Sequence, residues 1–167
     1  GELETADVEK DADVEKLLTA AQNNKELKLS WQHNGNAKTH NFSIANIERG
    51  ATASGIKLTW NGKPMNIDIA GNKTIEVPAI GDFKVMNVVA INDAEQYASV
   101  QFSDPIALGQ ELSGLVTMDN QADITYTING SEVKLYAGDK MDGNYSVTIN
   151  PGIKNTWGDT LQKGYTA

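Results

Sequence analysis

The chain has 167 residues, of which 40% are hydrophobic and 22% are charged, a composition typical of globular domains rather than of disordered chains. No apolar run approaches the roughly 20 residues that a membrane-spanning helix needs. Fourteen basic residues against 22 acidic ones give a net charge of −8, which disfavours nucleic acid and anionic membrane surfaces as partners. The absence of cysteine excludes disulfides, thiolate metal sites, cysteine nucleophiles and thioesters.

The first 25 residues are predicted to be an acidic lead-in that contains one short helix. Seven acids and two lysines between residues 2 and 16 give this stretch a charge of −5. A short amphipathic helix over residues 11–22 is indicated by apolar residues at helical spacing, namely Val14, Leu17, Leu18 and Ala21. The helix is interpreted as a linking or capping element, or alternatively as an acidic partner-binding helix. Gly1 is expected to be a cleavage scar.

From residue 26 onwards the hydrophobic pattern changes to the period of two that is typical of strands. In the first domain, residues 26–81, strands are predicted at 27–31, 39–47, 56–60, 65–69 and 74–77. Asn34-Gly35-Asn36 is predicted to close a hairpin between the first two strands, and Ala70-Gly71-Asn72 to form a later turn. Pro78 ends the last strand because it has no N–H to donate.

A second domain, residues 82–167, is predicted after the turn-rich segment 78–82. Its strands are expected at 83–89, 97–102, 115–118, 124–128, 132–136 and 145–149, and Asn129-Gly130 is the clearest tight hairpin turn. Short strands separated by turn signals at this spacing are typical of β-sandwiches. The predicted fold class is therefore all-β, with two small Ig-like or macroglobulin-like antiparallel β-sandwich domains preceded by a short amphipathic helix.

Metal-ligating residue types occur in two places. His33 and His40, the two histidines of the chain, flank the first hairpin turn, but no carboxylate lies in that segment to complete a site. Asp119, Asn120 and Asp123 cluster without the glycine and bidentate glutamate of a helix-loop-helix calcium site. The first pair is interpreted as exposed turn residues and the second group as a polar turn, so no metal and no cofactor are expected.

Catalysis by paired carboxylates is the enzymatic alternative. Acidic residues gather near one end of the second domain, at Asp82, Asp93, Glu95 and Asp104. Acids in loops and at strand edges are ordinary on a net-acidic β protein, and no nucleophile motif or phosphate-binding loop accompanies them. No catalytic residue is assigned, and the chain is predicted not to be an enzyme.

Aromatic residues supply the one candidate interaction surface. Trp31 and Trp60 alternate in phase with leucines and are expected on buried faces. Trp157 lies in a loop, where it is either exposed or caps the core. Together with Tyr136 and Tyr145 it forms a candidate contact surface for glycan or protein, and the loops near Asp104 and Asp119 are the alternative contact.

Several strings of the sequence resemble known bacterial domains. VQFSDP (100–105), GNYSVTI (143–149) and GIKNTWGDTL (152–161) resemble a bacterial Ig-like domain. LKLSWQH (27–33), LTWNGKP (58–64) and VPAIGDFKV (77–85) resemble the N-terminal region of the large alpha-2-macroglobulin-like proteins of Bacteroidetes. The resemblance spans about residues 12–165.

This resemblance implies a function that the residues alone do not. The chain would be the non-catalytic N-terminal structural or interaction domains of a bacterial protease trap of the cell envelope, periplasmic or anchored as a lipoprotein in the outer membrane. Its partners would be neighbouring domains of a longer chain and, through the full-length protein, a target protease; membrane contact would come only through an anchor outside these residues. The alternative is an independent cell-surface Ig-like binding module for glycan or protein.

One motif of the family is missing. Many relatives carry a Cys-x-Glu-Gln thioester, whereas Asp93-Ala94-Glu95-Gln96 has no cysteine, and the family's motif lies far downstream. The local match is therefore a coincidence. Neither bait segment nor thioester is assigned to this chain, and no residue inherits a trapping role.

Overall fold

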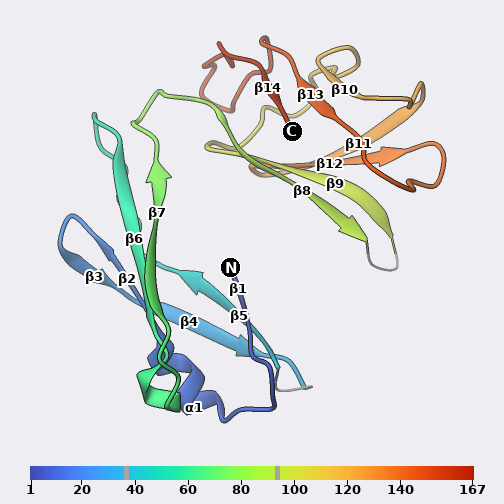
Figure 1. The fold of residues 1–167 in the computed structure, drawn as a ribbon. Coiled ribbons are helices and arrows are strands. Elements are labelled where there is room, and N and C mark those ends of the chain that lie inside the picture. The colour runs from blue at the N-terminus through green and yellow to red at the C-terminus, as the bar shows by residue number, and fades with distance from the viewer. Residues whose placement is uncertain (36–37, 93–94) are drawn as a thin grey trace. The chain divides into compact units, whose positions relative to one another are not determined.

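The computed structural model describes residues 1–35, 38–92 and 95–167, and it confirms an all-β fold with antiparallel sheets and one short helix (Figure 1). Asn36 of the predicted turn and Asp93 and Ala94 of the predicted acidic segment lie outside the described residues. The chain divides into two compact units, Gly1–Ile80 and Gly81–Ala167. They are called unit 1 and unit 2 below, and each contains two sheets.

Unit 1 consists of a three-stranded and a four-stranded sheet. The three-stranded sheet has the order β1-β5-β4, with β1 at Glu2–Glu4, β4 at Leu29–His33 and β5 at Thr39–Ile44. The four-stranded sheet has the order β3-β2-β6-β7, with β2 at Leu18–Gln22, β3 at Lys25–Leu27, β6 at Ser54–Asn61 and β7 at Ala70–Val77. Short helical turns occupy Asp11–Val14 (α1), Glu15–Leu17 (η1) and Lys63–Met65 (η2).

The predicted helix over 11–22 is wrong beyond residue 17. Helical turns end at Leu17, and the following five residues form β2, which pairs with both β3 and β6. Leu18, Ala20 and Gln22 are buried while Thr19 is exposed, so this segment follows the period of a strand. Two flanking strands satisfy its backbone, and this pairing overrides the local helical spacing. Residues 1–25 are thus part of both sheets rather than a separate lead-in.

Two strand boundaries in unit 1 also differ from the prediction. The predicted strand 27–31 is interrupted at Lys28, where the chain passes from β3 in one sheet to β4 in the other. The predicted strand 65–69 belongs to the loop between β6 and β7, closed by a hydrogen bond from Gly62 N to Ile69 O of 2.7 Å. Ala70-Gly71-Asn72 is the start of β7 and not a turn. A Cβ on Gly71 would lie 2.5 Å from the Trp60 ring, so glycine at this position allows that ring to pack directly on the backbone.

The core of unit 1 is small. Buried apolar side chains from the four-stranded sheet meet half-buried Leu29, Trp31, Phe42 and Ile44 from the other sheet. The buried set comprises Leu18, Ala20, Leu27, Ile56, Leu58 and Val77. The prediction that Trp60 is buried is wrong. Its side chain lies outside this core, and 37% of the surface of Trp60 is exposed.

Unit 2 contains a four-stranded sheet of order β11-β12-β9-β8 and a three-stranded sheet of order β10-β13-β14. The strands of the first are β8 (Val85–Asn92), β9 (Gln96–Phe102), β11 (Ile124–Asn129) and β12 (Glu132–Ala137). Those of the second are β10 (Val116–Met118), β13 (Val147–Ile149) and β14 (Tyr165–Thr166). The tight turn at Asn129-Gly130 is confirmed: Asn129 pairs with Glu132, and Gly130 has a φ of 59°.

A continuous core fills unit 2. It includes Phe102, Leu135, Ile149 and Ile153, each at most 2% exposed. Phe83 and Phe102 stack with their ring centroids 5.7 Å apart. The alternation of buried residues along β9, β12 and β13 is the pattern expected of strands with one face on a core.

Replacing Leu135 in this core is expected to destabilise unit 2. Leu135 is fully buried, so Leu135→Ala should lower the free energy of unfolding by about 2–5 kcal/mol through lost contacts and a cavity. Urea unfolding followed by circular dichroism measures the change. Leu108→Ala is the matched control, because Leu108 is 79% exposed and its truncation should cost less than about 0.5 kcal/mol. Equal effects of the two variants would contradict the described core.

Glu111 in unit 2 carries a carboxylate with an unusual number of donors. Its Oε1 accepts hydrogen bonds from Ser113 Oγ at 2.6 Å, Ser113 N at 3.0 Å and Tyr126 Oη at 2.9 Å. These hydrogen bonds, led by that of the Ser113 hydroxyl, lower the pKa of Glu111 from 4.5 to about 2. The ionised form is therefore favoured in the folded state.

The lowered pKa of Glu111 implies that the stability of unit 2 depends on pH. Because the folded-state pKa lies below the unfolded-state value, the contribution of Glu111 is full above about pH 4.5 and is lost as the pH falls towards about 2. Glu111→Gln should therefore be less stable than the native chain at about pH 6, and the difference should shrink at about pH 3. Urea unfolding at both pH values tests this, with the exposed Glu95→Gln as control. A difference that is constant with pH would contradict the assignment.

Candidate functional site

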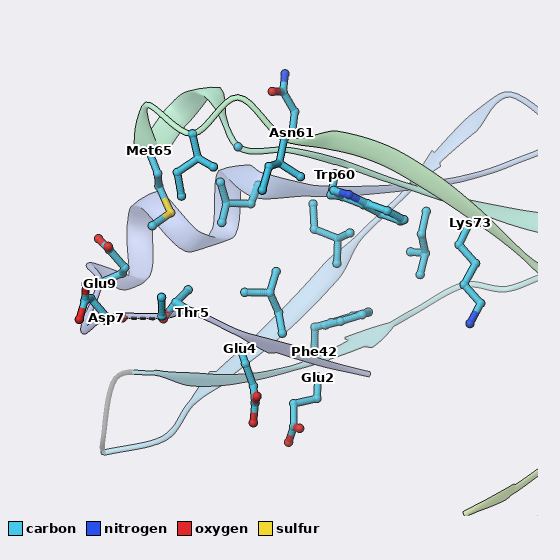
Figure 2. Close-up of a pocket in the computed structure, with 18 residues that line it drawn as sticks. Glu2, Glu4, Thr5, Asp7, Glu9, Phe42, Trp60, Asn61, Met65 and Lys73 are labelled. Carbon is cyan, nitrogen blue, oxygen red and sulfur yellow. Dashed lines mark hydrogen bonds between the residues drawn. The ribbon is translucent and has the colours of Figure 1, made fainter.

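An apolar hollow of about 550 Å³ opens between the two sheets of unit 1 (Figure 2). Phe42 of β5 and Trp60 of β6 line it from different sheets, and Met65 lines it from η2. The remaining apolar lining comes from Leu3, Leu17, Leu18, Leu58, Ile67 and Ile69. This hollow, called the groove below, lies beside the small core of the unit.

Several large apolar side chains that line the groove are exposed. Ile69 is 63% exposed, Ile67 44% and Trp60 37%. Contiguous exposed apolar residues of this kind mark interaction surfaces. Period-two reasoning assigned Trp60 to the buried face; the ring instead packs over Gly71 at the edge of the groove.

Charges at the groove are mostly negative. Glu2, Glu4, Asp7 and Glu9 come from the N-terminal segment, and Lys73 comes from β7. Close-range attraction therefore favours a positively charged group next to an apolar one. The arrangement is suited to binding an apolar segment that carries Lys or Arg.

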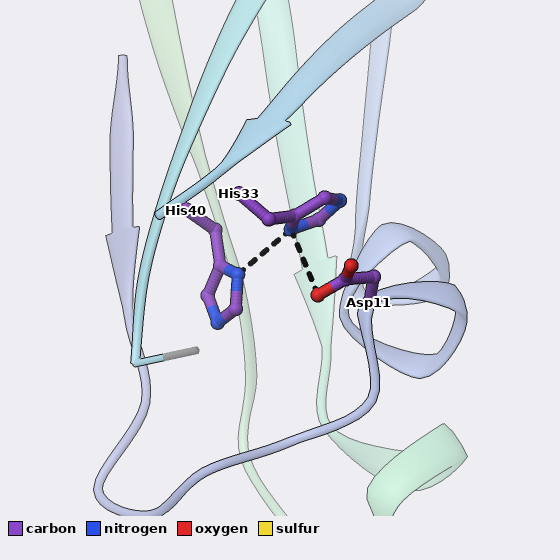
Figure 3. Close-up of side chains that lie close together, drawn as sticks. All are labelled: Asp11, His33 and His40. Carbon is purple, nitrogen blue, oxygen red and sulfur yellow. Dashed lines mark hydrogen bonds and ion pairs between the residues drawn. The ribbon is translucent and has the colours of Figure 1, made fainter. Parts of the chain in front are cut away.

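The two histidines form a second cluster in unit 1 (Figure 3). His33 of β4 and His40 of β5 are directly paired across the strands, with their Nδ1 atoms 2.8 Å apart. His40 is fully buried, and the side chain of His33 is 15% exposed. The expectation of two exposed turn histidines is therefore wrong, because this last pair of the hairpin is covered by the segment around α1.

Carboxylates reach this pair from the helical turns upstream. Asp11 Oδ1 lies 3.5 Å from His33 Nδ1, and Glu15 Oε1 lies 3.2 Å from His33 Nε2. One atom each from Asp11, His33 and His40 lies within 4.8 Å of the others, a grouping that could hold a metal ion. Both carboxylates lie upstream of the hairpin, outside the segment in which a ligand was expected. The available signal was the i, i+4 spacing of Asp11 and Glu15, which places both on one side of a helical turn.

The three residues of the predicted aromatic surface lie on different segments of unit 2. Trp157 is 68% exposed and so does not cap the core. In its loop, Asn155 Oδ1 accepts hydrogen bonds from Trp157 N and Asp159 N. Tyr136 is half-buried on β12, with its ring 5.6 Å from that of Tyr97. Tyr145 is half-buried before β13, and its hydroxyl contacts the backbone of residue 142.

The prediction that the acidic residues gather near one end of the second domain is wrong: Asp82 and Asp104 lie at one end of the β8–β9 hairpin, whereas Glu95 lies at its opposite end, just before β9. Asp104 is 3% exposed and accepts a hydrogen bond from Ser103 Oγ at 2.5 Å, so it faces the interior rather than a ligand. Asp82 pairs with Lys84 at 2.8 Å. Asp119 is exposed beside a turn, consistent with a polar loop.

Comparisons with known proteins assign no function to the site. No protein-family model matches the chain, and no curated protein matches it. Among the described residues, no helix has both the length and the apolar character needed to cross a membrane.

Proposed function

We propose that the chain forms a pair of non-catalytic interaction modules of a longer protein of the cell envelope, one related to the bacterial alpha-2-macroglobulin-like protease inhibitors. The sequence strings quoted above support the relationship, and two β units in tandem suit such modular proteins. The groove of unit 1 is the observation that carries the proposal. In this account protease trapping belongs to other parts of the protein, and these units hold neighbouring domains in place.

The occupant of the groove is an apolar segment of a neighbouring domain, flanked by Lys or Arg. The groove has a volume of about 550 Å³, which is within the range of protein ligand sites, about 300–1,000 Å³, and is large enough for several side chains. Trp60 and Phe42 supply flat apolar contact surfaces, the kind of residue that dominates binding energy in interfaces. The acidic residues that line the groove favour a positive charge on the flanking residues of the partner.

A second function is favoured by one observation in unit 2. Trp157 is 68% exposed, and an exposed indole is a common anchor for glycans and proteins. In this alternative the chain is an independent cell-surface module, and binding takes place at the loop of Trp157 instead of the groove.

Peptide binding distinguishes the two functions. Peptides selected against the 167-residue chain from a random phage-displayed library should combine apolar residues with Lys or Arg. Ile67→Lys should weaken their binding at least about tenfold, because it places a charge in the groove. Fluorescence anisotropy of a labelled peptide measures the affinity.

Ile47→Lys is the matched control. Ile47 has the same exposure as Ile67, 44%, and lies in the same unit but does not line the groove. This variant should bind like the native chain. Selected peptides that lose affinity in Trp157→Ala while tolerating Ile67→Lys would refute the groove and support the alternative.

A further inference from the structure

We propose that Asp11, His33 and His40 form a zinc site that joins the β4–β5 hairpin to α1. The site is separate from the groove, because none of these three residues lines it. It therefore does not depend on the function proposed above.

Two of the three distances between ligand atoms lie near those of a zinc site, and the third, between Asp11 and His40, is within 4.8 Å. Tetrahedral Zn²⁺ with bonds of about 2.0–2.2 Å places its ligand atoms about 3.4 Å apart. Asp11 Oδ1 and His33 Nδ1 are 3.5 Å apart, which meets this requirement. The two Nδ1 atoms are 2.8 Å apart and need to separate by about 0.6 Å. Water would take the fourth position.

Glu15 prepares His33 to be a ligand. Its Oε1 is 3.2 Å from His33 Nε2, so the carboxylate accepts the Nε2–H hydrogen bond. The lone pair of neutral His33 is then on Nδ1, the atom that faces His40 and Asp11 (Figure 3). A carboxylate that fixes the tautomer of a metal-bound histidine in this way is a regular feature of zinc sites.

The metal-free pair is a poor structural hydrogen-bond network. Only one proton fits between two Nδ1 atoms 2.8 Å apart, and buried His40 Nε2 has no partner among the described residues. Zn²⁺ would take the place of the shared proton, which would move to Nε2 of His40, so that both rings stay neutral and each Nδ1 lone pair binds the metal. The local charge favours this exchange, because residues 2–16 carry a charge of −5.

Nitrogen and oxygen donors together select the metal. Two imidazoles with one carboxylate suit Zn²⁺, whereas Ca²⁺ and Mg²⁺ prefer sites made of oxygen atoms. Bound Zn²⁺ would connect α1 to the end of the β4–β5 hairpin. The expected role is structural.

Zinc titration of the tag-free chain tests the site. Isothermal titration with Zn²⁺ alone should give one ion per chain, and the imidazole ¹⁵N signals of both histidines should shift. The chain has two histidines, so the spectrum is readily assigned. Asp11→Asn should weaken binding by more than about tenfold, and Glu15→Gln by about tenfold, in line with losses of 10–100-fold for groups that only orient a ligand.

Asp13→Asn is the matched control. Asp13 is on the same helix but pairs with Lys16 at 2.9 Å, so its variant should bind Zn²⁺ like the native chain. Asp11 is exposed, so its replacement should leave the fold intact, which circular dichroism verifies. The proposal is overturned if either histidine signal fails to shift, or if Asp11→Asn binds as tightly as Asp13→Asn.

Discussion

The scarcity of buried apolar side chains in unit 1 is the constraint on which the rest of the account depends. Among the described residues, six form its core, against fifteen in unit 2. Hydrophobic burial is the main force that holds sheets together. With so few residues, the sheets of unit 1 enclose a core over part of their length and leave the groove over the rest. Unit 2 has the larger core.

Polar contacts join the end of the β4–β5 hairpin in unit 1 to the helical turns. His33 and His40 occupy the last pair of the β4–β5 hairpin, and Glu15 and Asp11 approach them from the helical turns. A metal at this cluster would stabilise the folded state by binding it in preference to the unfolded one. The groove and the histidine cluster are therefore two consequences of one small core, the first available to a partner and the second available to a cation.

Local patterns predicted the fold class and many of the strands, but long-range pairing decided the rest. The turn at Asn129-Gly130 could be predicted because its conformation is set by its own residues. Residues 18–22 could not, because Leu17 and Leu18 also fit a helix and only pairing with β3 and β6 makes the segment a strand. The approach of Asp11 to His33 likewise depends on how α1 folds back, which no nearby residue specifies.

The central functional claim is that these units serve a longer envelope protein, and the size of the native gene product tests it most directly. An immunoblot of fractionated source cells, with an antibody raised against the 167-residue chain, should show a band many times larger than 18.0 kDa in the membrane fraction. A native product near 18.0 kDa would contradict the account, because the units would then act alone and no neighbouring domain of the same chain could fill the groove.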